Sequence, residues 1–118
     1  MSKPYKRYVP KNISELDDLL GSMMLQSPTF LDKSGYFSKQ NIENTFDAFN
    51  EGLESVRREI SEDMYLKFRE MSDHMRAHFK ADPENKTGDA SKGCAIIREM
   101  EELLLPHLRR LYSPRRSL

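Results

Sequence analysis

The chain has 118 residues, a length typical of one domain with a modest core. Apolar residues make up 37% and charged residues 32% of it, and 19 basic and 19 acidic side chains give a formal net charge of +0. No apolar run approaches the roughly 20 residues that span a bilayer. The single cysteine, Cys94, excludes an internal disulfide and, with no apolar signal-peptide stretch near residue 1, predicts a cytoplasmic protein.

Charge is distributed unevenly along the chain. The two ends, residues 1–11 and 107–118, contain eight basic residues and no acidic one: Lys3, Lys6, Arg7, Lys11, Arg109, Arg110, Arg115 and Arg116. The residues between them therefore hold 11 basic and 19 acidic side chains, a formal charge of −8. An acidic body of this kind would attract a basic partner, although an ordinary solvated helical surface has a similar composition.

The first helix is predicted to follow Ser14, because Asp17 lies three residues later in a capping-box arrangement. Apolar residues then fall on one face: Leu16, Leu19, Leu20 and Met23. Pro28 is expected either to end this helix or to begin another turn, with Ser27 as its cap. Residues 1–12 are expected to be irregular, and residues 30–37 are expected to form a packed loop.

The strongest periodicity predicts a helix from about Ser38, a candidate cap, to Ile60. Six apolar residues with spacings of 4, 3, 4, 3 and 4 form one stripe: Ile42, Phe46, Phe49, Leu53, Val56 and Ile60. Gly52 inside this helix suggests a close crossing with another helix. Ser61 is a further candidate cap, and the sequence leaves open whether it separates two helices. Apolar residues continue beyond it to about Ala81: Met64, Phe68, Met71, Met75 and Phe79.

Residues 82–92 form the clearest predicted loop, and a last helix is expected from Asp89 or Ala90. Its apolar face comprises Ile96, Ile97, Met100, Leu103, Leu104, Leu108 and Leu111. Pro106 predicts a kink or a new short helix, and residues 113–118 are expected to be irregular. The chain is thus predicted to be all-α, a single domain over residues 1–118 that forms a bundle of four to five helices with short loops.

No enzyme signature is present. Glu70, His74 and His78 lie on one face of the predicted third helix, and a metal-binding enzyme built on them is one hypothesis. However, Met75 follows the first histidine where a metalloprotease helix carries its general base. Cys94 has no recognisable partner base. We therefore expect no catalytic residue, metal or cofactor.

The polar face of the predicted second helix carries an acidic stripe. Its members, spaced 4, 4 and 3, are Glu43, Asp47, Glu51 and Glu54. Like charges one helical turn apart repel, so the pattern suggests either use by a basic partner or a merely solvated face. The acids of the predicted loop, Asp82, Glu84 and Asp89, are further candidates for partner binding.

A family resemblance covers about a third of the chain, from Met71 to Leu104. The residues that carry it are Met75-Arg76-Ala77, Phe79, Ala81-Asp82-Pro83-Glu84, Thr87-Gly88, Gly93, Ile96-Ile97 and Glu99-Met100-Glu101. This helix-loop-helix segment resembles small helical immunity proteins of contact-dependent growth inhibition and other bacterial polymorphic toxin systems. The resemblance implies a cytoplasmic, non-enzymatic protein that binds one cognate toxin, often a nuclease with a basic surface, and occludes it.

An alternative hypothesis is a helical regulator that contacts nucleic acid phosphates through the basic ends of the chain. The acidic middle argues against it, because it would repel a duplex unless both ends gathered on one side.

Overall fold

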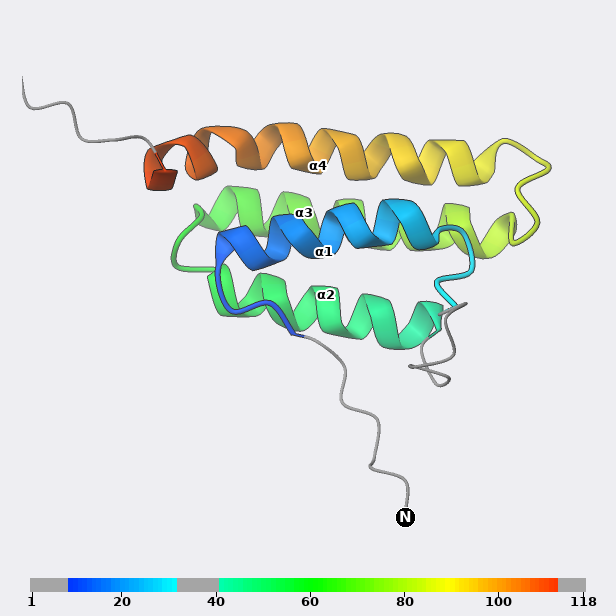
Figure 1. The fold of residues 1–118 in the computed structure, drawn as a ribbon, viewed down its shortest axis with the longest axis horizontal. Helices are drawn as coiled ribbons and strands as arrows, with labels where there is room; N and C mark the ends of the chain where they lie inside the picture. The colour runs from blue at the N-terminus through cyan, green and yellow to red at the C-terminus, as the bar shows by residue number, and fades with distance from the viewer. Residues whose placement is uncertain (1–8, 32–40, 113–118) are drawn as a thin grey trace, which may run out of the picture.

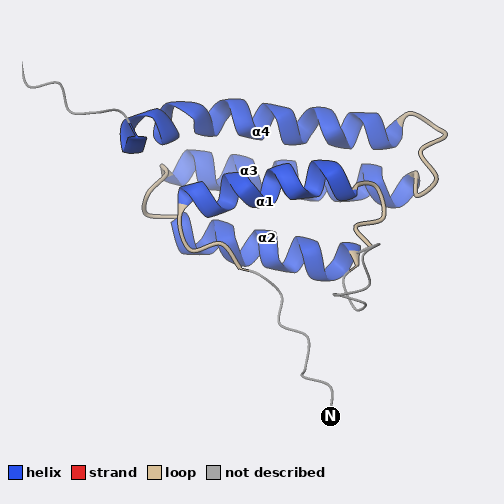
Figure 2. Ribbon diagram, in the orientation of Figure 1, coloured by secondary structure: helices blue, strands red, loops and turns tan. Residues whose placement is uncertain are grey.

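The computed structural model describes residues 9–31 and 41–112, with side chains through Arg110. Four helices form within these ranges, and no strand does: α1 (Ile13–Gln26), α2 (Ile42–Val56), α3 (Glu62–Ala81) and α4 (Asp89–Tyr112) (Figures 1 and 2). The prediction of an all-α bundle is confirmed, with four helices. Most of the loop predicted over residues 30–37 and the irregular ends at 1–8 and 113–118 lie outside the described residues.

Each helix runs antiparallel to the one before it (Figure 1). α1 packs against α2 and α4, and α3 packs against the same two helices, whereas the diagonal pairs make no comparable contact. The result is an up-down-up-down four-helix bundle. Within the described part of the chain, no helix has the length and apolar character needed to cross a membrane.

Asparagines rather than the expected serines cap the first two helices. The side chain of Asn12 accepts a hydrogen bond from the backbone N–H of Glu15 at 2.9 Å, so α1 begins at Ile13 and Ser14 lies inside it. Asn41 caps α2 in the same way, and Ser38 lies outside the described residues. Asparagine and serine are about equally good caps, and the buried Ile13 extends the apolar face by one turn.

Ser61 separates two helices, which answers the question that the sequence left open. α2 ends at Val56, and the Ser61 hydroxyl accepts the backbone N–H of Met64 at 3.1 Å at the start of α3. Ile60, predicted as the last residue of the second helix, lies in the turn between them. It is nevertheless 4% exposed, because the turn folds this side chain onto the core.

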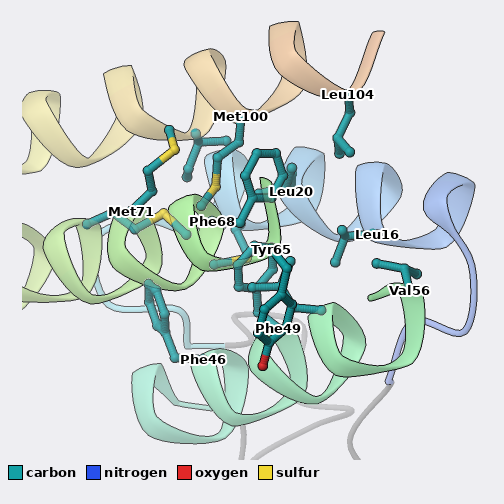
Figure 3. Packing of buried hydrophobic residues seen from close by; sticks show 14 of the residues in the cluster. Leu16, Leu20, Phe46, Phe49, Val56, Tyr65, Phe68, Met71, Met100 and Leu104 are labelled. Carbon is teal, nitrogen blue, oxygen red and sulfur yellow. The ribbon is translucent and has the colours of Figure 1, made fainter. Parts of the chain in front are cut away.

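The apolar stripes of all four helices meet in one core (Figure 3). The largest fully buried side chains are Phe30, Phe46, Phe49, Phe68, Phe79, Leu16, Leu20, Met23, Leu53, Met75, Ile97 and Met100. Phe30, which follows α1, packs edge-on against Phe46 and Phe79, with ring centroids 5.6 and 5.1 Å apart. The segment after α1 therefore joins the core that the helices form.

Two features of the helices differ from expectation. α4 continues through Pro106 to Tyr112, so of the two predicted alternatives, a kink or a new short helix, the new short helix does not form. Proline has no backbone N–H to donate to the carbonyl four residues earlier in the helix. Because Pro106 is exposed, water can hydrogen-bond to that carbonyl instead. Gly52 does mark a close approach, but to a different element: a Cβ at Gly52 would lie 2.8 Å from the ring of Pro10, in the segment before α1.

Candidate functional site

The acidic stripe of α2 lies beside α3, and its first member is paired across that boundary. Glu43 forms ion pairs with Arg76 and with Lys80, and Lys80 Nζ lies 2.6 Å from Glu43 Oε1. Both cations belong to the last part of α3. Glu43 thus links the start of α2 to the end of α3 and is not an isolated surface charge.

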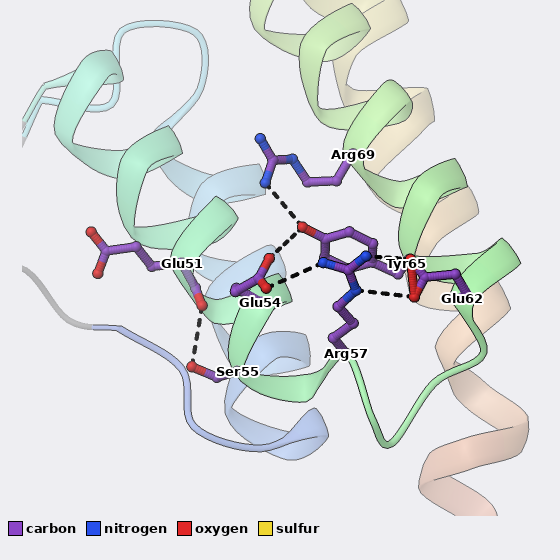
Figure 4. A network of polar contacts seen from close by, with 7 residues as sticks. All are labelled: Glu51, Glu54, Ser55, Arg57, Glu62, Tyr65 and Arg69. Carbon is purple, nitrogen blue, oxygen red and sulfur yellow. Dashed lines mark hydrogen bonds and ion pairs between the residues drawn. The ribbon is translucent and has the colours of Figure 1, made fainter.

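The last member of the stripe belongs to a polar network at the opposite end of the bundle (Figure 4). Glu54 accepts hydrogen bonds from the Tyr65 hydroxyl and from Arg57, the latter at 3.3 Å. Arg69 donates to the same hydroxyl at 3.2 Å. The Arg57 guanidinium also lies 4.2 Å from the centroid of the Tyr65 ring and bonds to Glu62. These contacts connect the end of α2 to the first turns of α3 and stabilise the turn between the two helices.

The network also keeps its carboxylates ionised. The hydrogen bond from Tyr65 lowers the pKa of Glu54, and Arg57 adds to this effect by hydrogen bonding and by its charge. The hydrogen bond from Arg57 lowers the pKa of Glu62. Both carboxylates therefore remain charged below the pH at which an ordinary glutamate would take up its proton.

Between these two ends, the middle of the stripe borders a shallow hollow of about 440 Å³. Asp47, Asn50, Glu51 and Glu54 from α2 and Arg69 from α3 line it, and we call these five residues the acidic hollow. Asp47 and Glu51 are exposed. Asn50 is fixed in place, because its side-chain oxygen accepts a hydrogen bond of 2.9 Å from Ser72, which is 1% exposed.

The loop acid Asp82 has a structural position. It is 1% exposed, and its carboxylate accepts the backbone N–H groups of Lys86, Thr87 and Ala90 at 2.6, 3.1 and 3.1 Å. Burial alone would raise the pKa of Asp82, but these hydrogen bonds lower it to about 2. Asp82 therefore organises the loop and the first turn of α4, and it presents no carboxylate to a partner.

The other two loop acids lie apart from the acidic hollow, at the end of the bundle where α3 meets α4. Glu84 is exposed and forms a surface ion pair of 3.0 Å with Lys86. Asp89 is half-buried and contacts His78 Nδ1 at 3.0 Å while accepting the Thr87 hydroxyl at 3.0 Å. The hydrogen bond with His78 is the main cause that lowers the pKa of Asp89. The seven acidic residues that were predicted to bind a partner thus form two separate groups and do not share one surface.

The residues considered for metal binding do not converge. His78 is turned toward Asp89, while His74 and Glu70 are exposed on α3. Among the residues that the structure describes, no group of three histidine, cysteine or acidic side chains could bind a metal ion. Cys94 is half-buried, with Sγ 3.3 Å from the Ser27 hydroxyl.

The basic ends can be placed only in part. Lys11 is exposed before α1, and Arg109 and Arg110 are exposed in the last turns of α4. Lys3, Lys6, Arg7, Arg115 and Arg116 lie outside the described residues. The structure therefore does not test whether the two ends gather on one side of the bundle.

The cations that face the stripe were not predicted from the sequence. Arg69, Arg76 and Lys80 are spaced 7 and 4 along α3, so they share one helix face and meet the acids of α2. That spacing was visible in the sequence. Which helix it faces was not, because the pairing depends on how α2 and α3 pack.

Comparisons with known proteins add no identification: no family model matches the chain, and no curated protein or solved structure shows significant similarity to it.

Proposed function

We propose that this protein is an immunity protein that binds a cognate toxin through the acidic hollow and covers the basic active-site cleft of that toxin. The observation that carries this proposal is the exposure of Asp47 and Glu51 at the rim of the hollow. The flanking acids Glu43 and Glu54 form ion pairs within the protein, and the two central acids, Asp47 and Glu51, are exposed to solvent between them.

Charge and rigidity both support this use of the surface. Residues 12–106 carry a formal charge of −8, which would steer a basic nuclease domain toward the bundle. The ion pairs of Glu43 and the network around Tyr65 fix α2 against α3 at both ends of the hollow. A surface that is already rigid loses little conformational entropy when it binds.

The mechanism requires no chemistry from the protein. Lysine and arginine side chains that line a nuclease cleft for phosphate binding would contact Asp47 and Glu51, and the bundle would cover the cleft. Inhibition would therefore be stoichiometric. The toxin would act in the cytoplasm, the compartment that the single cysteine favours for this chain.

The test is co-expression with any candidate toxin domain found encoded beside this gene, followed by binding kinetics on the purified pair. Replacing Asp47→Asn together with Glu51→Gln should preserve the fold. It should slow association about tenfold at low ionic strength and flatten the salt dependence, because steering depends on these charges. Growth protection should weaken in parallel.

A matched control removes two charges elsewhere. Asp18→Asn with Glu99→Gln changes two exposed acids on α1 and α4, and this variant should associate and protect like the wild type. If both double variants behave alike, the acidic hollow does not form the interface. If no neighbouring toxin domain binds the wild-type protein, the assignment as an immunity protein fails.

A further inference from the structure

The outer face of α4 carries a second periodic stripe, separate from the one buried in the core. Its six exposed members are spaced 4, 3, 4, 3 and 4, and we call them the outer seam: Ser91, Ala95, Arg98, Glu102, Leu105 and Arg109. This alternating spacing is that of the a and d positions along which two helices pack. No described element of the chain covers the outer seam, since every member is exposed.

The outer seam is complementary to itself when a second copy is placed antiparallel to it. A two-fold axis at the level of Met100 brings Ala95 opposite Leu105 of the second copy and Arg98 opposite Glu102. Symmetry repeats each contact, so the same alignment provides two apolar contacts and two ion pairs. A parallel alignment in register would instead bring Arg98 against Arg98 and Glu102 against Glu102.

The surface around the seam has the shape that this alignment needs. A hollow of about 500 Å³ lies between the end of α1 and the first half of α4, and Ser91, Cys94, Ala95 and Arg98 line its α4 side. These four positions, i, i+3, i+4 and i+7, are those that form the hole for a partner's knob. In the antiparallel alignment the side chain entering this hollow is Leu105, which is 42% exposed in the single chain.

The charges of the seam also suit a second copy. Within the described ranges, neither Arg98 nor Glu102 takes part in a hydrogen bond or ion pair, although they lie four residues apart on one helix. Asp17 of α1 and Glu101 lie beside them around a neighbouring hollow of about 380 Å³. Burial and the charge of Asp17 raise the pKa of Glu101, and the charge of Arg98 partly offsets them. Among the described residues, three acids, Asp17, Glu101 and Glu102, border this hollow with Arg98 as the one basic residue, so a second Arg98 would reduce an excess of negative charge.

From these observations we infer that the protein forms a symmetric antiparallel dimer through the outer seam of α4, with Leu105 of each copy seated in the hollow beside Ala95 of the other. α4 and α2 are diagonal in the bundle. The dimer therefore leaves the acidic hollow open, and it does not rest on the proposed function.

Sedimentation velocity over a concentration series tests the dimer. With only two apolar contacts, one on each side of the two central ion pairs, the seam should give a weak dimer that is evident by about 1 mM, near the weak end of specific association. Arg98→Glu and Glu102→Arg should each weaken the dimer at least about tenfold, because each places like charges together twice. Combining the two substitutions restores opposite charges and should restore dimerisation.

Two further variants separate loss of the interface from loss of the fold. Leu105→Glu should abolish the dimer, whereas Leu66→Glu, at a leucine 55% exposed on α3, should leave it intact. In a Cys94→Ser background, Ala95→Cys with Leu105→Cys should form disulfide-linked dimers. Ala95→Cys alone should not, because the antiparallel seam keeps the two copies of residue 95 apart.

A wild-type protein that remains monomeric at about 1 mM would overturn the inference. So would a dimer that survives Leu105→Glu, or a combined charge-reversal variant no better at dimerising than either single variant. Cross-linking by Ala95→Cys alone would show a different alignment and reject the proposed one.

Discussion

Replacing Gly93 by alanine would test how closely α3 and α4 approach each other. A Cβ added at Gly93 would lie 2.6 Å from Cε1 and Cζ of Phe79 and 3.0 Å from Cδ1, whereas ordinary van der Waals contact begins at 3.4 Å. The Phe79 ring has little freedom to move away. It is 0% exposed and packs edge-on against Phe30.

Two opposing effects set the magnitude. Alanine is a better helix former than glycine and would by itself stabilise α4 by about 0.5–1 kcal/mol. Forcing a methyl group into a packed core destabilises by about 1–3 kcal/mol. The steric effect is the larger one, so we expect Gly93→Ala to lower the free energy of unfolding by about 1–2 kcal/mol. That change corresponds to a fall of roughly 4–8 °C in the melting midpoint of a domain of this length.

Urea unfolding followed by circular dichroism measures the effect, and Gly21→Ala is the matched control. A Cβ at Gly21, also inside a helix, meets nothing within 4 Å, so this variant should gain about 0.5–1 kcal/mol. In a Phe79→Leu background, the loss of unfolding free energy caused by Gly93→Ala should become smaller or turn into a gain. A double-mutant cycle measures this difference. If Gly93→Ala stabilises as much as Gly21→Ala does, the close approach of α4 to Phe79 is refuted.

Two further predictions concern the loop and the core. Because the pKa of Asp82 is about 2 instead of its usual 3.8, this group stabilises the fold above pH 3.8, and that stability is lost as pH falls toward 2. Asp82→Asn should flatten this part of the acid-unfolding profile, whereas the control Glu84→Gln should leave it unchanged. Equal profiles for Asp82→Asn and the wild type would contradict the stabilising role of the Asp82 carboxylate. Phe49→Ala should lower the free energy of unfolding by about 3–5 kcal/mol, since Phe49 is 0% exposed. Leu66→Ala, on the surface, should change it by no more than about 0.5 kcal/mol, and a near-neutral Phe49→Ala would argue against the core as described.

The helices and their buried faces could be predicted from the sequence because the signals are local. The stripe from Ile42 to Val56 repeats with the helical period, and those residues face the core in the bundle. The predicted helix boundaries were less accurate than the predicted helix faces, because serine and asparagine residues that could each cap a helix lie within a few residues of each other. Ser14 and Asn12 illustrate this: the burial of Ile13 and a hydrogen bond from the Lys11 N–H to the Glu15 side chain both favour the earlier start.

Which acidic side chains are paired or buried and which are exposed was decided by tertiary structure alone. In the sequence, the four acids of the α2 stripe look equivalent. Packing of α2 against α3 brings Arg76 and Lys80 to Glu43, more than thirty positions away in the chain, and leaves Asp47 exposed. Asp82 looks like an exposed loop acid until the loop closes around it and directs three backbone N–H groups at its carboxylate. Local periodicity determines where helices form, but ion pairs and buried hydrogen bonds depend on which helix faces meet, and that is a property of the assembled bundle.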